Sequence, residues 1–588
     1  MGGGGANSLD SPNIGENTVE DDDKSPEKEQ GWATPIYKTY EDYFIDYFNL
    51  PSEAYTTDGT SITIDYSSIT RTIVNGETSL SYNREVFDVI TSKDLVGQGT
   101  ASDPYIVHSI RGFLWLSNKN ISQISLDSKC ISLKCDVILN DESFDENGKP
   151  SGGDGVIYQW EPIRNGSNVE INGNNNSISG LYINTPEKSG CGLFWYTSSL
   201  RLKSIYNLSM AGLYIKGKNY TYSFGYSVNY LENVTTTGTI DCVDKYAFGF
   251  AFICYQVKNC ENYINFYNSS WIGGFFGEPL TDGWCVENCN NYGKIYSPNK
   301  GAYMGGIFIF PAKKGKIINC NNFGDITGAD NACGGIFGRS SGQQLIKGCK
   351  NYGKIDVETQ YGGIVGFVEG VLTLDDCQNY GEVVVSNGGS CGLLVGYVSS
   401  RFIKGNTDIN INNCKTYNYF ANVHVVGATV IEQDGSPREI YIDISKCEFV
   451  AQDEAQFTIV GVLNYANVFV SVKDVEIVAN SKVLIVRSLN KKAILNIEYV
   501  IVRFCNSNAY LTICGSINNE IKSKIKVEGV ICIIKNLRGI YYGSDFSGFY
   551  CDFKTGKIGL KALSGKGFYQ GKVTEDLLVS KGFEKKVI

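Results

Sequence analysis

Histidine is nearly absent from this chain of 588 residues. The two copies, His108 and His424, lie far apart in the sequence. A histidine-based zinc site or a catalytic triad needs partner residues that the sequence does not place beside them. We therefore expect no metal, no cofactor and no catalytic residue. We expect each histidine to be an ordinary residue on a β-sheet surface.

Long hydrophobic runs are missing as well. The sequence has no stretch of 18 apolar residues, the length that a membrane-spanning helix needs. Residues 1–6 lack the positive charge and apolar core of a secretory signal, so we expect that the chain is not secreted on its own. The net charge of −10 disfavours nucleic acid and anionic membranes as partners.

Cysteine is too sparse for a disulfide-stabilised scaffold. The chain has 19 cysteines, an odd number, and several of them recur at regular intervals. This placement predicts thiols that pack inside the fold of a protein made in a reducing compartment.

What the sequence does contain is a repeat. A phrase of the form Cys-x-Asn-Tyr/Phe-Gly begins at Cys289, Cys320, Cys349 and Cys377, at intervals of 31, 29 and 28 residues. A glycine pair followed by apolar residues recurs between these copies, as at 273–277 and 334–338. The period is too short for a propeller blade, and it contains no apolar stripe of helical spacing. With 66 Gly, 38 Tyr and 29 Phe against 12 Pro, the composition is typical of short strands joined by tight turns.

These features predict an all-β protein, a right-handed parallel β-helix in which one repeat forms one rung. Equivalent residues of successive rungs then stack about 4.8 Å apart. The stacking predicts two structural ladders, one of Cys260, Cys289, Cys320, Cys349 and Cys377, and one of Asn291, Asn322, Asn351 and Asn379. The spacing would also permit disulfides, but an inward stack of thiols is the simpler interpretation. Stacked asparagine amides can bond one another along the axis.

The repeat also divides the chain. We expect a disordered acidic and glycine-rich arm (1–31), an N-terminal attachment or capping domain (32–95), the start of the β-helix (96–184), regular repeats (185–400), irregular rungs (401–539) and a C-terminal cap or tip (540–588). Within the second region, the aromatic run from Tyr37 to Phe48 predicts a short helix, and Asn75-Gly76 predicts a hairpin turn. Residues 160–540 would give about a dozen rungs and a rod on the order of 60 Å long.

Part of the chain resembles a known family. The phrases Gly97-Gln-Gly-Thr-Ala-Ser-Asp-Pro-Tyr-Ile-Val and Asn172-Gly-Asn-Asn-Asn-Ser-Ile-Ser-Gly-Leu-Tyr-Ile look like the beginning of proteins with GLUG-type repeats. The glycine-pair and cysteine phrases resemble the repeat itself, so the likeness covers about Val96 to Ser399. It implies a β-solenoid of the adhesin-like or phage-surface kind, and it carries over no catalytic residues.

Aromatic residues supply the candidate ligand contacts. Flat rings beside asparagines suit carbohydrate faces, and the rings concerned are Trp195, Trp271, Trp284, Tyr292, Phe323, Tyr352 and Tyr380. The alternative is that the tyrosine and phenylalanine residues only pack along a turn. For Trp271 and Trp284, which we expect in loops near Pro279, packing and binding remain equally open.

An enzyme of the same fold is the third possibility. Glycoside hydrolysis needs two facing carboxylates, and the candidate pairs are Asp375 with Asp376, Asp241 with Asp244, and Asp141 with Glu142. Neighbours on a strand point to opposite faces, which counts against the first pair. The acidic loop 140–148 loosely resembles a cation site, but its spacing is not that of an EF-hand and a solvated loop is the simpler interpretation.

We therefore expect a non-enzymatic structural and surface-recognition protein. The first hypothesis is a virion component assembled in the cytoplasm, such as a phage fibre, spike or capsid decoration. It would contact a host-surface glycan or protein, join other virion proteins through its N-terminal region, and could form a homotrimer by analogy with other spikes. The alternatives are a bacterial or protist adhesin at the cell surface and a polysaccharide-degrading enzyme.

Overall fold

A computed structural model describes residues 35–552 of the chain, except for internal gaps. The gaps are 60, 142, 151–154, 165, 196–200, 280, 300–301, 329–330, 359, 385–390, 400–405, 419–422, 430–438, 452–455, 464–467, 490–492, 505–510, 518–523, 529–530, 535–539 and 542–549. The expected N-terminal arm and most of the expected C-terminal cap or tip therefore lie outside the described residues.

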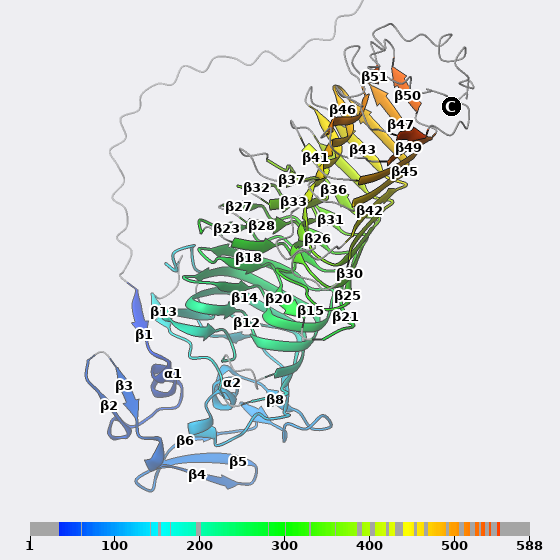
Figure 1. Cartoon of the computed structure of the whole chain (residues 1–588). Coiled ribbons are helices and arrows are strands. Elements are labelled where there is room, and N and C mark those ends of the chain that lie inside the picture. The colour runs from blue at the N-terminus through cyan, green and yellow to red at the C-terminus, as the bar shows by residue number, and fades with distance from the viewer. Residues whose placement is uncertain are drawn as a thin grey trace, which may run out of the picture.

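The first described elements form a small separate layer at one end of the molecule (Figure 1). They are β1 (Ile36–Lys38), α1 (Tyr40–Tyr47), η1 (Ser52–Ala54), β2 (Tyr55–Thr57), β3 (Ile62–Ile64), η2 (Tyr66–Ser68), β4 (Ile69–Val74), β5 (Glu77–Tyr82) and β6 (Glu85–Ile90). The predicted helix is confirmed as α1. The predicted hairpin is confirmed as well, because β4 pairs antiparallel with β5 across Asn75-Gly76, and both turn residues have positive φ.

Next come β7 (Leu95–Val96), β8 (Tyr105–Val107), α2 (Ile110–Ser117), α3 (Lys119–Ser122), β9 (Cys130–Leu133), β10 (Val137–Ile138) and β11 (Val156–Tyr158). Aromatic side chains hold this layer to the coil: Tyr43 of α1 stacks on Tyr158 at 4.4 Å between ring centroids, and Phe113 of α2 lies against Trp160 at 6.1 Å. Strand β1 pairs in parallel with β11. The first turns of the coil are thus covered rather than left with open backbone groups.

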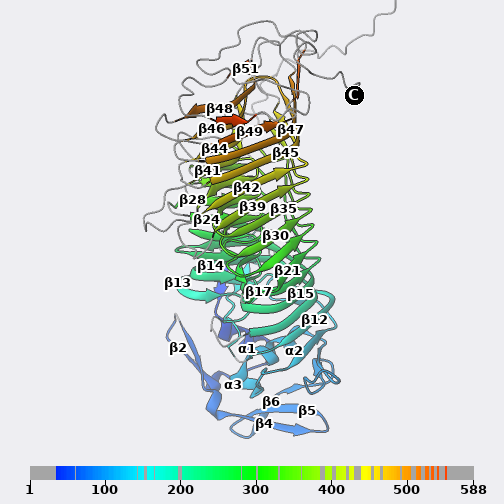
Figure 2. The same cartoon turned by 45° about the vertical axis from the view of Figure 1, so that its right-hand side comes forward.

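The rest is a parallel β-solenoid of about 12 turns, which confirms the predicted fold class and the predicted dozen rungs (Figures 1 and 2). It begins with the long strands β12 (Glu170–Ser179), β13 (Tyr182–Cys191), β14 (Arg201–Tyr222) and β15 (Gly225–Cys242). Each later turn has up to four short strands, and each strand pairs with its equivalent one turn on. In the turn after β15 and β16 (Tyr246–Phe248), the strands are β17 (Ala251–Lys258), β18 (Glu261–Tyr267), β19 (Trp271–Gly273) and β20 (Phe276–Pro279).

The same four positions recur along the coil. Equivalents of β17 are β21 (Trp284–Glu287), β25 (Gly315–Ile318), β30 (Gln343–Lys347), β35 (Val371–Asp375), β39 (Thr407–Asn412) and β42 (Ile440–Ser445). Equivalents of β18 are β22 (Asn290–Asn291), β26 (Asn321–Asn322), β31 (Lys350–Asn351), β36 (Gln378–Asn379), β40 (Lys415–Asn418) and β43 (Glu448–Ala451). Strands β23 (Ile295–Ser297), β27 (Ile326–Gly328) and β32 (Ile355–Val357) continue this second position.

Equivalents of β19 are β24 (Ala302–Gly305), β28 (Asn331–Gly334), β33 (Gln360–Gly362) and β37 (Cys391–Gly392). The fourth position forms an eight-stranded sheet of β29 (Phe337–Ser340), β34 (Val365–Val368), β38 (Val395–Val398), β41 (Val423–Thr429), β44 (Phe457–Leu463), β46 (Val483–Leu489), β48 (Leu511–Ile517) and β51 (Ile540–Tyr541). The coil continues through β45 (Val468–Ala479), β47 (Ala493–Phe504), β49 (Lys524–Glu528), β50 (Ile531–Ile534) and β52 (Tyr550–Asp552). The parallel coil therefore continues beyond Ser400.

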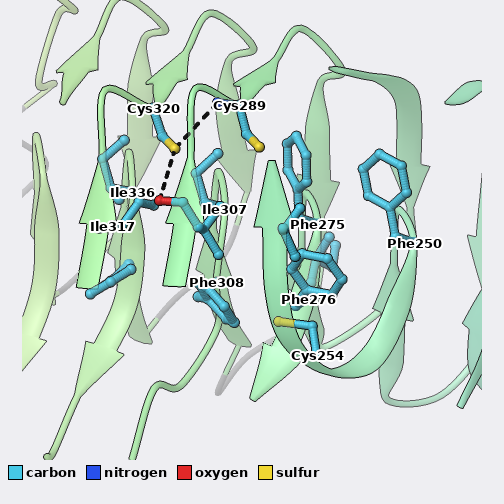
Figure 3. Close-up of a cluster of buried hydrophobic side chains, with 14 of the residues drawn as sticks. Phe250, Cys254, Phe275, Phe276, Cys289, Ile307, Phe308, Ile317, Cys320 and Ile336 are labelled. Atoms are coloured by element: carbon cyan, nitrogen blue, oxygen red, sulfur yellow. Dashed lines mark hydrogen bonds between the residues drawn. The ribbon is translucent and has the colours of Figure 1, made fainter. Parts of the chain in front are cut away.

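The cysteines of the repeat stack inside the coil (Figure 3). The column runs through Cys260, Cys289, Cys320, Cys349, Cys377, Cys414 and Cys447, all of them buried. The backbone N–H of Cys320 donates to the Sγ of Cys349 at 3.3 Å, and the Cys320 thiol donates to the Ile318 carbonyl at 3.3 Å. The fifteen cysteines whose side chains the structure describes are all free thiols. Each sulfur of the column thus acts in a hydrogen-bonded contact that needs no disulfide.

Beside the thiols runs a buried column of asparagine amides. The Nδ2 of Asn291 donates to the Oδ1 of Asn322 at 2.8 Å, and Asn322 donates in the same way to Asn351 at 2.9 Å. The column begins when Thr236 donates to Asn262 and ends at Asn379, which accepts from Asn351. Each of the four amides from Asn291 to Asn379 also donates to the glycine carbonyl two residues on.

The glycine of the repeat phrase has its own physical reason. A Cβ on Gly324 would lie 1.9 Å from the carbonyl oxygen of Gly293 in the neighbouring rung. The same close approach recurs at Gly353 and Gly381. Only glycine lets the backbones of successive turns come this close. The close contact between these backbones excludes water from the amide column.

Substitution of Asn322 tests how much the amide column contributes to the stability of the fold. Asn322→Ala removes two donated bonds and leaves the Oδ1 of buried Asn351 without the donor it has now. We expect the free energy of unfolding to fall by on the order of 3 kcal/mol, measured by urea denaturation. The matched control is Asn321→Ala, since Asn321 is the outward neighbour that donates to Asn290 at 2.9 Å. Equal losses in the two variants would contradict the assigned role.

Candidate functional site

Six aromatic rings form a straight stack on the outside of the coil. Their centroids lie 4.5 to 5.0 Å apart with interplanar angles of 6° or less, and the rings are Tyr263, Tyr292, Phe323, Tyr352, Tyr380 and Tyr417. The column exists because five of the rings follow a buried asparagine by one position and so point outward, and Tyr417 follows buried Thr416 in the same way.

This geometry changes what the stack can bind. Each inner ring is covered on both faces by the rings above and below, so a sugar cannot lie flat on it. The ring edges are open, with Phe323 38 % and Tyr352 41 % exposed. The candidate residues Tyr292, Tyr352 and Tyr380 are therefore brought together, but they offer edges and hydroxyl groups instead of faces.

A second aromatic group has a different geometry. We call it the Trp271 corner; its partly exposed members are Tyr220, Tyr226, Tyr246, Phe252, Trp271, Tyr303 and Phe310. Register brings Tyr246, Trp271 and Tyr303 side by side on β16, β19 and β24. Tyr220 and Tyr246 stack at 4.6 Å, but the rings beside Trp271 cross it: Trp271 meets Tyr303 at 4.7 Å and 57°, and Tyr246 at 5.4 Å and 72°.

Two cations lie over rings of the Trp271 corner. Arg339 lies 4.7 Å from the centre of the Phe310 ring and forms an ion pair with Glu369, and the second cation is Lys245. Its Nζ lies 4.8 Å from the centre of the Trp271 ring and 5.1 Å from that of Tyr246. A cation held over ring faces is a moderate attraction at a partly exposed site. Because the lysine side chain is long and flexible, it can exchange this contact for one with a ligand hydroxyl or carboxylate. The corner thus combines tilted aromatic faces with one mobile cation.

Two of the three predicted tryptophans do not join this group. Trp284 is fully buried and its Nε1 donates to the Lys313 carbonyl at 2.9 Å, so the expectation of a loop residue that contacts ligand is corrected. The indole fits inside because Gly315 of the next turn has no side chain. Trp195 is partly exposed, but the Arg164 guanidinium covers its ring at 4.0 Å.

A shallow cavity of about 310 Å³ lies near Trp284. It is lined by Gly283, Trp284, Lys314, Gly315, Lys316, Gln343, Gln344, Leu345 and Thr373. Its volume is at the low end for a small-molecule site. The aromatic surfaces are therefore stronger candidates for ligand contact than this cavity.

Two of the three carboxylate pairs considered for hydrolysis have a member engaged in an ion pair, and Glu142 of the third pair lies outside the described residues. Asp375 forms an ion pair with Lys347 at 2.9 Å, which holds the pKa of Asp375 below its ordinary value. Asp241 is buried and pairs with Lys216 at 2.6 Å. In the acidic loop, Asp145 accepts the backbone N–H groups of Asn147 and Lys149, as a turn-forming residue does. Within the described residues, no group of three histidine, cysteine, aspartate or glutamate side chains could hold a metal ion.

His424 corrects another expectation. It is 7 % exposed on β41, not on the surface, and its Nε2 lies 3.4 Å from Arg487 Nη1. Burial, together with the Arg487 charge, lowers the pKa of His424 from 6.5 to about 4. His108 lies on the surface as expected. A neutral, buried imidazole beside an arginine is a packing residue of the irregular turns.

Sequence reasoning missed several residues that shape these surfaces. Tyr220, Tyr226 and Phe252 belong to long strands where the repeat is not yet visible. An outer column of left-handed asparagines was missed too: Asn259, Asn288 and Asn319 have φ near +53° and donate in turn to the preceding member. The signal was present, because an asparagine directly precedes Cys260, Cys289 and Cys320.

Comparison with known proteins leaves the family open. No family model, curated protein or solved structure matches the chain. The β-solenoid is therefore established by its own geometry, and the resemblance to GLUG-type repeats stays an expectation. Among the described residues, no helix is long and apolar enough to cross a membrane.

The burial of His424 gives a pH test. Because its pKa is lower in the folded chain than in the unfolded chain, unfolding takes up a proton between pH 6.5 and about 4. The contribution of His424 to stability is full above pH 6.5 and falls by roughly 3 kcal/mol as the pH drops through this window. We expect His424→Gln to flatten the pH dependence of the unfolding free energy and the surface control His108→Gln to leave it unchanged. If the unfolding free energy had the same pH dependence in the wild-type protein and both variants, His424 would not be the group responsible.

Proposed function

We propose that this protein is a rigid, rod-shaped surface-recognition component of a virion, and that it contacts host-surface glycans through the Trp271 corner. The observation that carries the proposal is the group of tilted, partly exposed rings around Trp271 with Lys245 beside them. Contiguous apolar patches that reach the surface mark interaction sites on soluble proteins. Tilted rings leave part of their faces open, and apolar sugar faces pack on aromatic faces.

The thiol column supports assembly in a reducing compartment. Cys289, Cys320 and Cys349 lie on neighbouring turns. In an oxidising compartment, such closely spaced cysteines would form disulfides with one another before folding was complete. The hydrogen bond from each thiol to a backbone carbonyl exists only while the sulfur carries its proton. Burial also raises the pKa of the Cys320 thiol. The folded coil thus keeps the reduced form and protects it.

The N-terminal layer suits attachment to other virion proteins. It packs firmly on the first turns of the coil through Tyr43 and Phe113. At its outer end, Ile73, Val74 and Val86 are 56 to 61 % exposed. Exposed aliphatic residues at the tip of a small sheet are suited to contact with another protein. We assign attachment to this end and recognition to the side of the rod.

Glycan binding tests the recognition half of the proposal. On an array of host-surface glycans, we expect Trp271→Ala and Tyr303→Ala each to weaken binding by roughly tenfold or more, because each removes a central aromatic contact. The matched control is Tyr441→Ala, which removes an exposed stacked tyrosine elsewhere on the rod. Unchanged binding in the two corner variants, or degradation of the glycan by the wild-type protein, would overturn the proposal.

Thiol counting tests the assembly half. We expect purified virus particles to contain the protein with all 19 cysteines reduced when alkylated after denaturation, as read by mass spectrometry. Before denaturation, the buried column should resist alkylation while partly exposed Cys285 reacts. Detection only on washed cells would favour the adhesin instead, and a largely disulfide-bonded chain would contradict cytoplasmic assembly.

A further inference from the structure

We propose a second binding surface, formed by the stacked rings instead of the crossed ones. The outer stack binds one extended chain of a neutral, unbranched β-1,4-linked polysaccharide along the rod axis. We call this surface the ladder face. It consists of the six stacked rings from Tyr263 to Tyr417 and the outward column beside them, Glu261, Asn290, Asn321, Lys350, Gln378 and Lys415.

The periodicity of the ladder face argues for a polymer. Six rings at intervals of 4.5 to 5.0 Å make a straight row on the order of 24 Å long at the usual strand spacing. An extended β-1,4-linked glycan advances by a similar distance per sugar, so one sugar can face one turn. A helical or branched glycan cannot keep this match over several turns.

The exposed atoms argue for a polyhydroxylated ligand. Covered ring faces leave only ring edges, whose hydrogens carry the positive end of the ring quadrupole and attract oxygen atoms. Five of the six rings are tyrosines whose hydroxyl groups lie at the outer end of the ring. The neighbouring column adds amides at the same spacing, with Asn321 bonded to Asn290 at 2.9 Å. Five of the six turns thus offer a phenol, and three turns add an amide. The hydroxyls of Tyr263 and Tyr380 donate to Glu261 and Gln378, which leaves their oxygens to accept from a ligand.

Charge argues for a neutral polymer. Glu261 is the one acidic member of the column beside the rings, and Lys350 and Lys415 are the basic ones. On the other side of the rings, Lys354 pairs with Asp356 at 3.0 Å. Neither a polyanion nor a polycation finds a continuous row of opposite charge here.

The width of the stack argues against a second copy of the chain as the occupant. An aromatic side chain buries about 150–250 Å² when fully covered, so six rings that are at most about two-fifths exposed offer at most on the order of 500 Å². A stable protein interface needs about 800 Å² from each partner. A stripe one ring wide and six turns long is the footprint of a single polymer chain.

The lone phenylalanine of the stack provides the sharpest test. Phe323→Tyr fills the gap in the row of hydroxyl groups, so we expect it to bind cellohexaose roughly threefold to tenfold more tightly than the wild-type protein by titration calorimetry. Tyr352→Phe removes one hydroxyl and keeps the stack, and we expect it to bind more weakly by a similar factor. A gain in affinity cannot be the result of misfolding.

Ligand length and linkage complete the experiment. We expect affinity to rise steadily from cellobiose to cellohexaose, and we expect maltohexaose, which coils, to bind at least tenfold more weakly than cellohexaose. Equal binding of the two hexaoses, no dependence on length, or no effect of either hydroxyl change would overturn the inference.

The inference shares its ligand chemistry with the proposed function but none of its residues, so the two can fail separately. Trp271→Ala should leave cellohexaose binding unchanged. Loss of cellohexaose binding in that variant would assign the polysaccharide to the Trp271 corner and refute the ladder face. Failure of the array experiment alone would leave the ladder face standing.

Discussion

The hydrogen bond from one asparagine amide to the next, repeated along the coil axis, is the constraint on which the rest of the structure depends. A buried amide that lacks a partner is costly, so Asn291, Asn322 and Asn351 must stay directly above one another. A shift of one residue would turn these side chains to the outside and their aromatic neighbours to the inside. The inner column thereby fixes the register of every turn that it joins.

The outer surfaces follow from that register. Since Tyr292 and Phe323 each come one residue after a buried asparagine, they are stacked because the amides are stacked. The Trp271 corner forms on another side of the same turns, where Tyr246, Trp271 and Tyr303 align with the glycine-pair phrase. One repeat therefore builds two surfaces of different character: a flat row of ring edges and a cluster of crossed rings.

Much of this could be predicted from spacing alone, because equivalent residues of a solenoid must stack. The columns of Cys320 and Asn322 are of this kind. Helix α2 was not anticipated, since the short run around Trp115 reads equally well as a buried strand. Trp284 lies inside only because Gly315, 31 residues later, leaves room for it. The burial of His424 and the Trp271 corner likewise depend on contacts between turns that no local pattern encodes.

Amide hydrogen exchange on the wild-type protein and on Asn322→Ala tests the central claim, that the buried amide column couples the turns, most directly. The account predicts faster exchange in the substituted turn and also in the turns of Asn291 and Asn351, about 30 residues away in each direction. The outward control Asn321→Ala should leave all three turns protected. Faster exchange confined to residues next to position 322 would contradict the account.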